Sequence, residues 1–226
     1  MTLILGILEE GLIYAVMALG VYITYKILDF PDLSVDSTFP LGAAFTASAI
    51  LAGVSPVLTL FLSFLAGAVA GCVTGLIHVK LKVRDLLSGI IVMTGLYSLN
   101  LRIADGRANL PIFTKETIFE NQFLASRLSS SLSPYTIVVI LLIITLLCKV
   151  LLDLYLNTRS GYLLRAVGDN EALVTSLAKD KGMVKIVGLA IANGFAALAG
   201  SIYCQHKVFF EISVVTGTIG IRLACV

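Results

Sequence analysis

Residues 56–79 read PVLTLFLSFLAGAVAGCVTGLIHV, and this stretch contains no Asp, Glu, Lys or Arg. A helix that crosses a bilayer needs roughly 20 mainly apolar residues, so the stretch is long enough to span a membrane. The whole chain of 226 residues agrees, because 58% of it is apolar, 13% is charged and its mean hydropathy is +0.99. Soluble domains carry about a quarter charged residues. The sequence therefore predicts a membrane protein and excludes an average soluble enzyme.

Three glycines recur at four-residue spacing within this stretch, at Gly67, Gly71 and Gly75. On a helix they fall near one face and leave a groove in which another backbone can pack. Tight packing between helices of the same chain is the plainer interpretation, and part of a subunit interface is the functional one. Neither interpretation assigns chemistry to the stretch.

Other apolar runs lie on both sides of this stretch. They predict membrane helices at about residues 11–28, 40–54, 85–103, 135–152 and 184–204, and a seventh helix can begin near Ile212. The run at 40–54 is too short to cross about 30 Å at 1.5 Å per residue, so it leans on the preceding loop or is half of a broken helix. We predict an all-α polytopic membrane protein: a single domain over residues 1–226, with about six transmembrane helices and a short or broken second helix.

Basic residues in short loops indicate which side of the membrane each loop faces. Lys80, Lys82 and Arg84 place the loop after the third helix in the cytoplasm. The stretch at about residues 154–185 is predicted to be cytoplasmic for the same reason, from Lys149, Arg159, Arg165, Lys179, Lys181 and Lys185. The segment at about 104–134 then lies outside, as does the N-terminus with Glu9 and Glu10.

Residues 28–43, LDFPDLSVDSTFPLGA, interrupt the helical pattern with two prolines and three aspartates. Irregular backbone at membrane depth persists only where protein or water surrounds it, and broken helices build substrate sites in transporters. Asp32, Ser34 and Asp36 are therefore candidates for a translocation path. The alternative is an ordinary cytoplasmic loop whose Asp and Ser side chains cap the next helix. Asn193 is a further candidate for the path, because a buried amide without a partner is costly, although it can instead bond a neighbouring helix.

Residues 154–185 mix charged and apolar side chains. They predict a short amphipathic helix from about Glu171 to Ala178, with Asp169 or Asn170 as its cap and an end near Gly182. Such a helix on the membrane face suits docking to another protein. The alternative is a solvated loop with an interfacial helix that contacts membrane lipid.

The remaining polar residues indicate no metal, cofactor or nucleic acid. The four cysteines lie far apart in or beside apolar segments, both histidines are solitary, and the net charge of +2 comes from scattered residues. We therefore expect no disulfide framework, metal site or nucleic-acid partner. The sequence has no GxxxxGK[ST] phosphate loop and neither HExxH nor GxSxG. Ser176 and Lys179 match the SxxK spacing of some serine nucleophiles, which leaves a membrane enzyme as an alternative that rests on two fixed positions.

The spacing of small and basic residues over 158–200 resembles the coupling region of ABC-importer permeases. It runs through Thr158-Arg159-Ser160-Gly161, Arg165-Ala166, Gly168, Asn170, Ala178 and Gly182 to Ala197-Leu198-Ala199-Gly200. Within that superfamily the chain resembles the branched-chain amino acid and sugar permeases, since residues 32–35 with Gly42-Ala43 look like a motif between their early helices. Residues 106–111 with 117–119 are similar to a subgroup predicted to serve amino acids, including aromatic ones.

This resemblance implies a permease subunit of an ATP-driven ABC importer in the bacterial inner membrane, for an amino acid or a related small solute. Such a permease pairs with a second copy or a paralogue, with a separate cytoplasmic ATPase and with an external solute-binding protein. It holds no cofactor itself, and the ATPase hydrolyses the ATP. The residues implied in coupling to the ATPase are Arg159, Gly161, Arg165, Ala166, Gly168, Asn170, Glu171 and Gly182.

Members of the family usually run some tens of residues further than Val226, and Arg222 stands where an apolar helix would continue, so a truncated product is one expectation. The rival function is a secondary transporter or channel driven by an ion gradient, in which Asp29, Asp32 and Asp36 would serve an ion pathway. Uptake that survives ATP depletion and collapses with the ion gradient would identify that rival.

Overall fold

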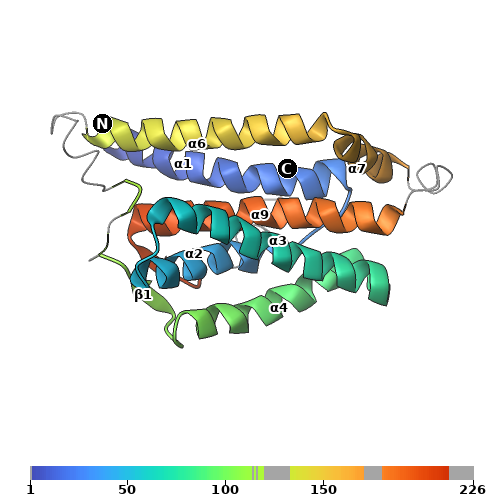
Figure 1. Ribbon diagram of the computed structural model, residues 1–226, viewed down its shortest axis with the longest axis horizontal. Coiled ribbons are helices and arrows are strands. Elements are labelled where there is room, and N and C mark those ends of the chain that lie inside the picture. Colours follow the sequence, from blue (N-terminus) through green and yellow to red (C-terminus); the bar gives the residue numbers. More distant parts are fainter. Residues whose placement is uncertain (1, 114, 116, 120–132, 171–179, 214–226) are drawn as a thin grey trace.

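The computed structural model describes residues 2–113, 115, 117–119, 133–170 and 180–213 (Figure 1). Its elements are α1 (Thr2–Tyr22), the π-helix η1 (Ile23–Ile27), α2 (Val35–Leu51), α3 (Pro56–Leu81), α4 (Asp85–Ile103), β1 (Asn109–Pro111), α6 (Ser133–Leu156), α7 (Arg159–Asp169), α9 (Lys181–Lys207) and β2 (Phe209–Glu211). Within the described ranges five helices are long and apolar enough to cross a membrane, namely α1 with η1, α3, α4, α6 and α9. With the shorter apolar α2 they confirm the predicted all-α polytopic membrane protein.

Two helices begin earlier than the sequence predicts. The first starts at Thr2 rather than near residue 11, because the acids that interrupt its apolar pattern find partners on α9: Lys207 Nζ donates to Glu10 Oε1 at 2.6 Å, and His206 Nε2 lies 3.5 Å from Glu9 Oε2. The second starts at Val35 rather than near residue 40, with Pro40 inside it. At 17 residues it remains the short second helix that the sequence predicts.

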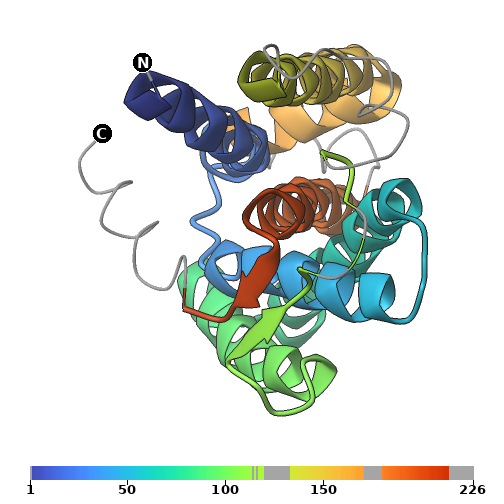
Figure 2. The same cartoon turned by 90° about the vertical axis from the view of Figure 1, so that its left-hand side faces the viewer.

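Helix α9 forms the centre of the bundle. Figure 2 looks along the bundle and shows α1 and α6 on one side of α9, with α2, α3 and α4 on the other. Of the most apolar window of α9, 78% is buried, against 17% for α6. The close approach of α3 depends on its glycines, because a Cβ at Gly67 or Gly71 would overlap a backbone carbonyl of α9, and one at Gly75 would lie 2.9 Å from Ile186 Cα.

A two-stranded antiparallel ribbon closes one end of the bundle, which we call the ribbon end. Strand β1 pairs with β2 in the register Asn109 to Glu211 and Pro111 to Phe209 (Figure 2). The sequence predicted neither strand, and β1 lies in the segment expected to be an external loop. Ile212, where a seventh helix was expected to begin, is buried directly after β2. The residues from 214 onward lie outside the described part of the chain.

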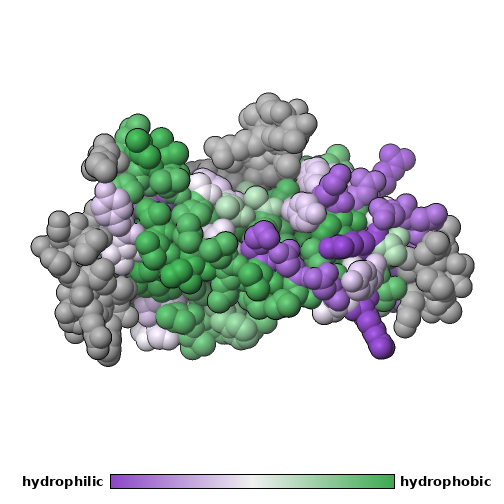
Figure 3. Space-filling model, turned by 90° about the horizontal axis from the view of Figure 1, so that it is seen from above, coloured by the Kyte–Doolittle hydropathy of each residue, from purple (hydrophilic) through white to green (hydrophobic). Residues whose placement is uncertain are grey.

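The opposite end of the bundle holds α7 together with the last turns of α3 and α6 and the first turn of α9, and we call it the α7 end (Figure 1). Figure 3 shows apolar side chains over the middle of one face and hydrophilic ones gathered toward the α7 end. Helix α6, for example, exposes many large apolar side chains: Val139, Leu142, Ile143, Leu146, Leu147, Val150, Leu151 and Leu154. Such an outer surface suits contact with lipid.

Candidate functional site

Four buried polar residues form a hydrogen-bonded group in the middle of the bundle, which we call the Asp32 cluster: Asp32, Ser34, Thr38 and Asn193. Asp32 Oδ2 accepts a hydrogen bond from Asn193 Nδ2 at 2.8 Å, and Asp32 Oδ1 accepts one from the Ser34 backbone N–H at 2.8 Å. Asn193 Oδ1 lies 3.1 Å from the Ser34 hydroxyl and 2.8 Å from the Thr38 hydroxyl. None of the four side chains is more than 1% exposed. The cluster therefore joins the interrupted segment to the central helix.

Most of the interrupted segment is enclosed by protein, whereas Asp29 is exposed. Asn193 lies near the middle of α9 and α4 covers the other side, where a Cβ at Gly89 would lie 2.9 Å from Leu33 N and 3.2 Å from Asp32 Oδ1. Irregular backbone at membrane depth needs such an enclosure, because lipid offers its polar groups no partners. Ser34 precedes α2 but makes no side-chain capping bond. The segment thus differs from an ordinary exposed capping loop.

A second buried amide, that of Asn100 in α4, contacts α2 near the Asp32 cluster. Asn100 is fully buried, and its Nδ2 donates to the Ser37 backbone carbonyl at 3.0 Å. Its Oδ1 has no hydrogen-bond partner within the described residues. Asp36, in the first turn of α2, is 4% exposed. Sequence reasoning named Asp36 but missed Asn100 and Thr38, although Asn100 is an amide in an apolar helix, the signal that identified Asn193.

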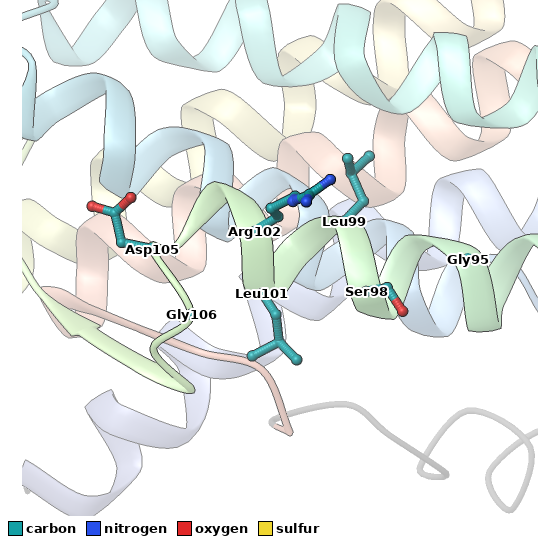
Figure 4. Close-up of a pocket in the computed structure, with 7 residues that line it drawn as sticks. All are labelled: Gly95, Ser98, Leu99, Leu101, Arg102, Asp105 and Gly106. Carbon is teal, nitrogen blue, oxygen red and sulfur yellow. The ribbon is translucent and has the colours of Figure 1, made fainter.

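One pocket of the molecule lies apart from these residues. A pocket of about 660 Å³ lies near the ribbon end, and Figure 4 shows residues that line it, among them Ser98 and Arg102 of α4 with Asp105 and Gly106 beyond the helix. None of Asp32, Ser34, Asp36 and Asn193 lines this pocket. Of the predicted path residues, Asp32, Ser34 and Asn193 thus form a buried hydrogen-bonded group away from this pocket, and Asp36 is also buried.

Most of the residues implied in ATPase coupling lie on α7 or at its end. Those on α7 are Arg159, Gly161, Arg165, Ala166 and Gly168, Asn170 is its C-cap, and Gly182 lies in the first turn of α9. Glu171 and the predicted helix from about Glu171 to Ala178 lie outside the described residues. The sequence did not predict α7 itself, which stands where loop was expected.

Helix α7 is stabilised by a side-chain cap at its start and by apolar residues that pack against the bundle. The Thr158 hydroxyl accepts from the Gly161 backbone N–H at 3.3 Å at its start. Leu164 and Val167 are buried toward the bundle, while Arg165 is exposed, so α7 is amphipathic. Close contacts anchor it, because a Cβ at Gly161 would meet the Leu156 backbone. The structure therefore fixes α7 against the membrane helices and leaves its basic face open.

A buried amide side chain, that of Gln205, links separate segments of the chain at the ribbon end. Gln205 of α9 donates from Nε2 to the Pro56 carbonyl and the Thr59 hydroxyl, each at 3.1 Å, and its Oε1 accepts from the Ile118 backbone N–H at 3.2 Å. Gln205 is fully buried. One side chain therefore connects α9, the start of α3 and the segment after β1.

Gln205→Leu should lower the free energy of unfolding by roughly 1–3 kcal/mol, because it removes the acceptor of the Ile118 N–H and both hydrogen bonds from Gln205 to the start of α3. Thermal unfolding in detergent measures the loss. Lys207→Ala is the control, since it removes a partly exposed ion pair with Glu10 worth at most about 1 kcal/mol. Equal melting temperatures for the two variants would show that Gln205 does not join these elements.

A bundle of apolar helices, built around an interrupted second helix and a buried group of acid, amide and hydroxyl side chains, defines a membrane transport protein. Residues 3–224 match the family described as the branched-chain amino acid transport system permease component. The chain therefore belongs to this family of transport permeases, and the prediction of a multi-pass permease subunit of an ABC-type transport system is confirmed.

The chain is similar to several individual permeases. It is 43% identical over 223 residues to a tyrosine transport system permease protein of Clostridioides difficile, an alignment that covers 99% of this chain and 71% of that relative. It is 32% identical over 213 residues to an uncharacterized protein of Rickettsia prowazekii, covering 94% of this chain and 71% of that protein. A ribose import permease protein of Haemophilus influenzae is 28% identical over 200 residues, an alignment that covers 88% of this chain and 59% of that relative. No solved structure matches the chain.

Proposed function

We propose that the chain is the permease subunit of an ATP-driven importer for tyrosine or a closely related aromatic amino acid. The observation that carries the choice of solute is the 43% identity, across 99% of this chain, to a tyrosine transport system permease. The more distant similarity to ribose permeases favours the amino acid over a sugar, since it is 28% or lower. The chain itself serves transport rather than catalysis, and it resides in the bacterial inner membrane.

The two ends of the bundle have different roles in this proposal. The α7 end faces the cytoplasm and binds a separate ATPase, because it gathers the basic residues that favour the cytoplasmic side. The ribbon end faces outward and receives solute from a binding protein. A second permease copy or a paralogue completes the translocation path. Asp32, Ser34, Asp36 and Asn193 hold the interrupted segment beside that path, where a change of helix packing rearranges their hydrogen bonds.

The test is transport by the complex purified from its native membrane in mild detergent and reconstituted into vesicles. With the binding protein outside and ATP at the ATPase, labelled tyrosine should accumulate, and a protonophore should leave the accumulation intact. Excess unlabelled tyrosine should compete, whereas ribose should not. Uptake that survives ATP depletion and collapses with the ion gradient would instead establish a secondary transporter, and competition by ribose would overturn the choice of solute.

A further inference from the structure

The end of α1 contains an unusual backbone turn. Residues 23–27 form a π-helix, at whose end the Leu28 N–H donates to the Ile23 carbonyl at 3.0 Å. Beyond it, the Phe30 N–H donates back to the Thr24 carbonyl at 2.9 Å. Asp29 follows with a φ of 50°, in the left-handed region that non-glycine residues seldom occupy. Short π-helical turns occur frequently at functional sites. This turn leads directly into the segment that carries Asp32.

Helix α7 packs against this turn with the two backbones in direct contact. A Cβ at Gly168 would overlap the Ile27 carbonyl oxygen and would lie 2.9 Å from the Ile27 carbonyl carbon and 3.3 Å from Leu28 Cα. The three nearest heavy atoms to that Cβ are all backbone atoms of Ile27 and Leu28. A movement of α7 toward or away from the bundle therefore displaces Ile27, the last residue of η1, because side-chain rotation cannot absorb the movement.

The next residues are held by other helices. The Leu28 side chain reaches Gly188 of α9, where an added Cβ would also contact Leu164 of α7, so Leu28 lies where these two helices meet. Phe30 makes an edge contact with His78 of α3, with ring centroids 5.1 Å apart. Asp32 is then fixed to Asn193. Only the few residues from Leu28 to Pro31 separate the α7 contact from the Asp32 cluster.

We infer that Gly168 is a positioning residue that transmits movement of α7 through η1 to the Asp32 cluster. The inference rests on the proposed function, in which α7 lies next to the ATPase, and it gives Gly168 a contact inside the permease rather than one on the ATPase. Packed elements shift between discrete arrangements instead of deforming continuously, so a small displacement of Ile27 changes the hydrogen bonds of Asp32. Two sites are thereby coupled by a continuous backbone connection.

Gly168→Ala tests this connection in the assembled complex. The added methyl group separates α7 from Ile27, so the amount of solute transported per ATP hydrolysed should fall severalfold or more. Gly75→Ala is the matched control, because its Cβ would also lie against a backbone atom of α9, 2.9 Å from Ile186 Cα, at a contact between α3 and α9 that involves neither α7 nor η1. It should lower the yield of folded protein while the purified complex keeps its transport-to-ATP ratio.

Leu28→Ala provides a second readout where Gly168→Ala does not accumulate. It removes the side chain between α7 and α9 without adding an atom, and it should lower the same ratio severalfold. An unchanged ratio in Gly168→Ala or Leu28→Ala, or an equal fall in Gly75→Ala, would overturn the inference. If the wild-type complex transports no solute with ATP, the proposed function fails; if it does and the variants match it, only the role of Gly168 fails.

Discussion

Asp32→Asn and Asn193→Asp should each abolish most transport when made alone, and the two together should recover part of it. In the native pair the Asp32 carboxylate accepts from the Asn193 amide, whose oxygen in turn faces the hydroxyls of Ser34 and Thr38. Asp32→Asn sets two amide N–H groups against each other, and Asn193→Asp sets two carboxylates together. Each loses a charge-assisted hydrogen bond in a buried site, at a cost of roughly 2–3 kcal/mol.

The double variant restores the pairing with donor and acceptor exchanged. An amide at position 32 can donate to a carboxylate at position 193, which still accepts from the two hydroxyls. Recovery is partial, because the Leu189 carbonyl, which accepts from Asn193 Nδ2 at 3.1 Å, would then face a carboxylate oxygen. Tyrosine uptake and the yield of folded protein measure the effect. A double variant no better than the worse single variant would show that the two side chains do not act as a pair.

Gly42→Ala should prevent most of the protein from folding. A Cβ at Gly42 of α2 would overlap the Ala197 carbonyl of α9, and one at Gly200 of α9 would overlap the Phe39 carbonyl of α2, so the two helices meet backbone to backbone. Overpacking a tight core costs about 1–3 kcal/mol or more, and here only a shift of a whole helix relieves it. The fraction of monodisperse protein in size-exclusion chromatography measures the loss.

Gly11→Ala is the control for this prediction. No atom lies within 4 Å of its added Cβ, and alanine is favoured over glycine inside a helix by about 1 kcal/mol. The variant should therefore fold as well as the native chain or slightly better. Equal yields from Gly42→Ala and Gly11→Ala would contradict the close crossing of α2 and α9.

Much of the helical framework follows from the sequence, because long apolar runs leave few alternatives in a membrane. The positions that sequence reasoning misplaced depend on partners far along the chain. Glu9 and Glu10 break the apolar pattern of α1 until His206 and Lys207 lie beside them. Pro40 marks a helix start by its local preference, yet α2 continues through it.

Several residues of the candidate site could be predicted from the sequence, but the hydrogen bonds between them could not. Asp32 and Asn193 stood out as polar residues in or beside apolar helices, whereas their hydrogen bond spans 161 positions that no local pattern records. Thr38 is a small hydroxyl of a kind common in helices, so nothing in the sequence distinguished it. The three-residue strands β1 and β2 are too short for alternation to reveal them.

The ribbon end determines how the bundle can move. Strands β1 and β2 tie the chain just after α4 to the chain just after α9, and Gln205 fastens the start of α3 at the same place. With that end fastened, the helices can tilt more freely at the far end than they can slide along one another. We therefore expect a displacement of α7 to move the helix ends at the α7 end more than those at the ribbon end.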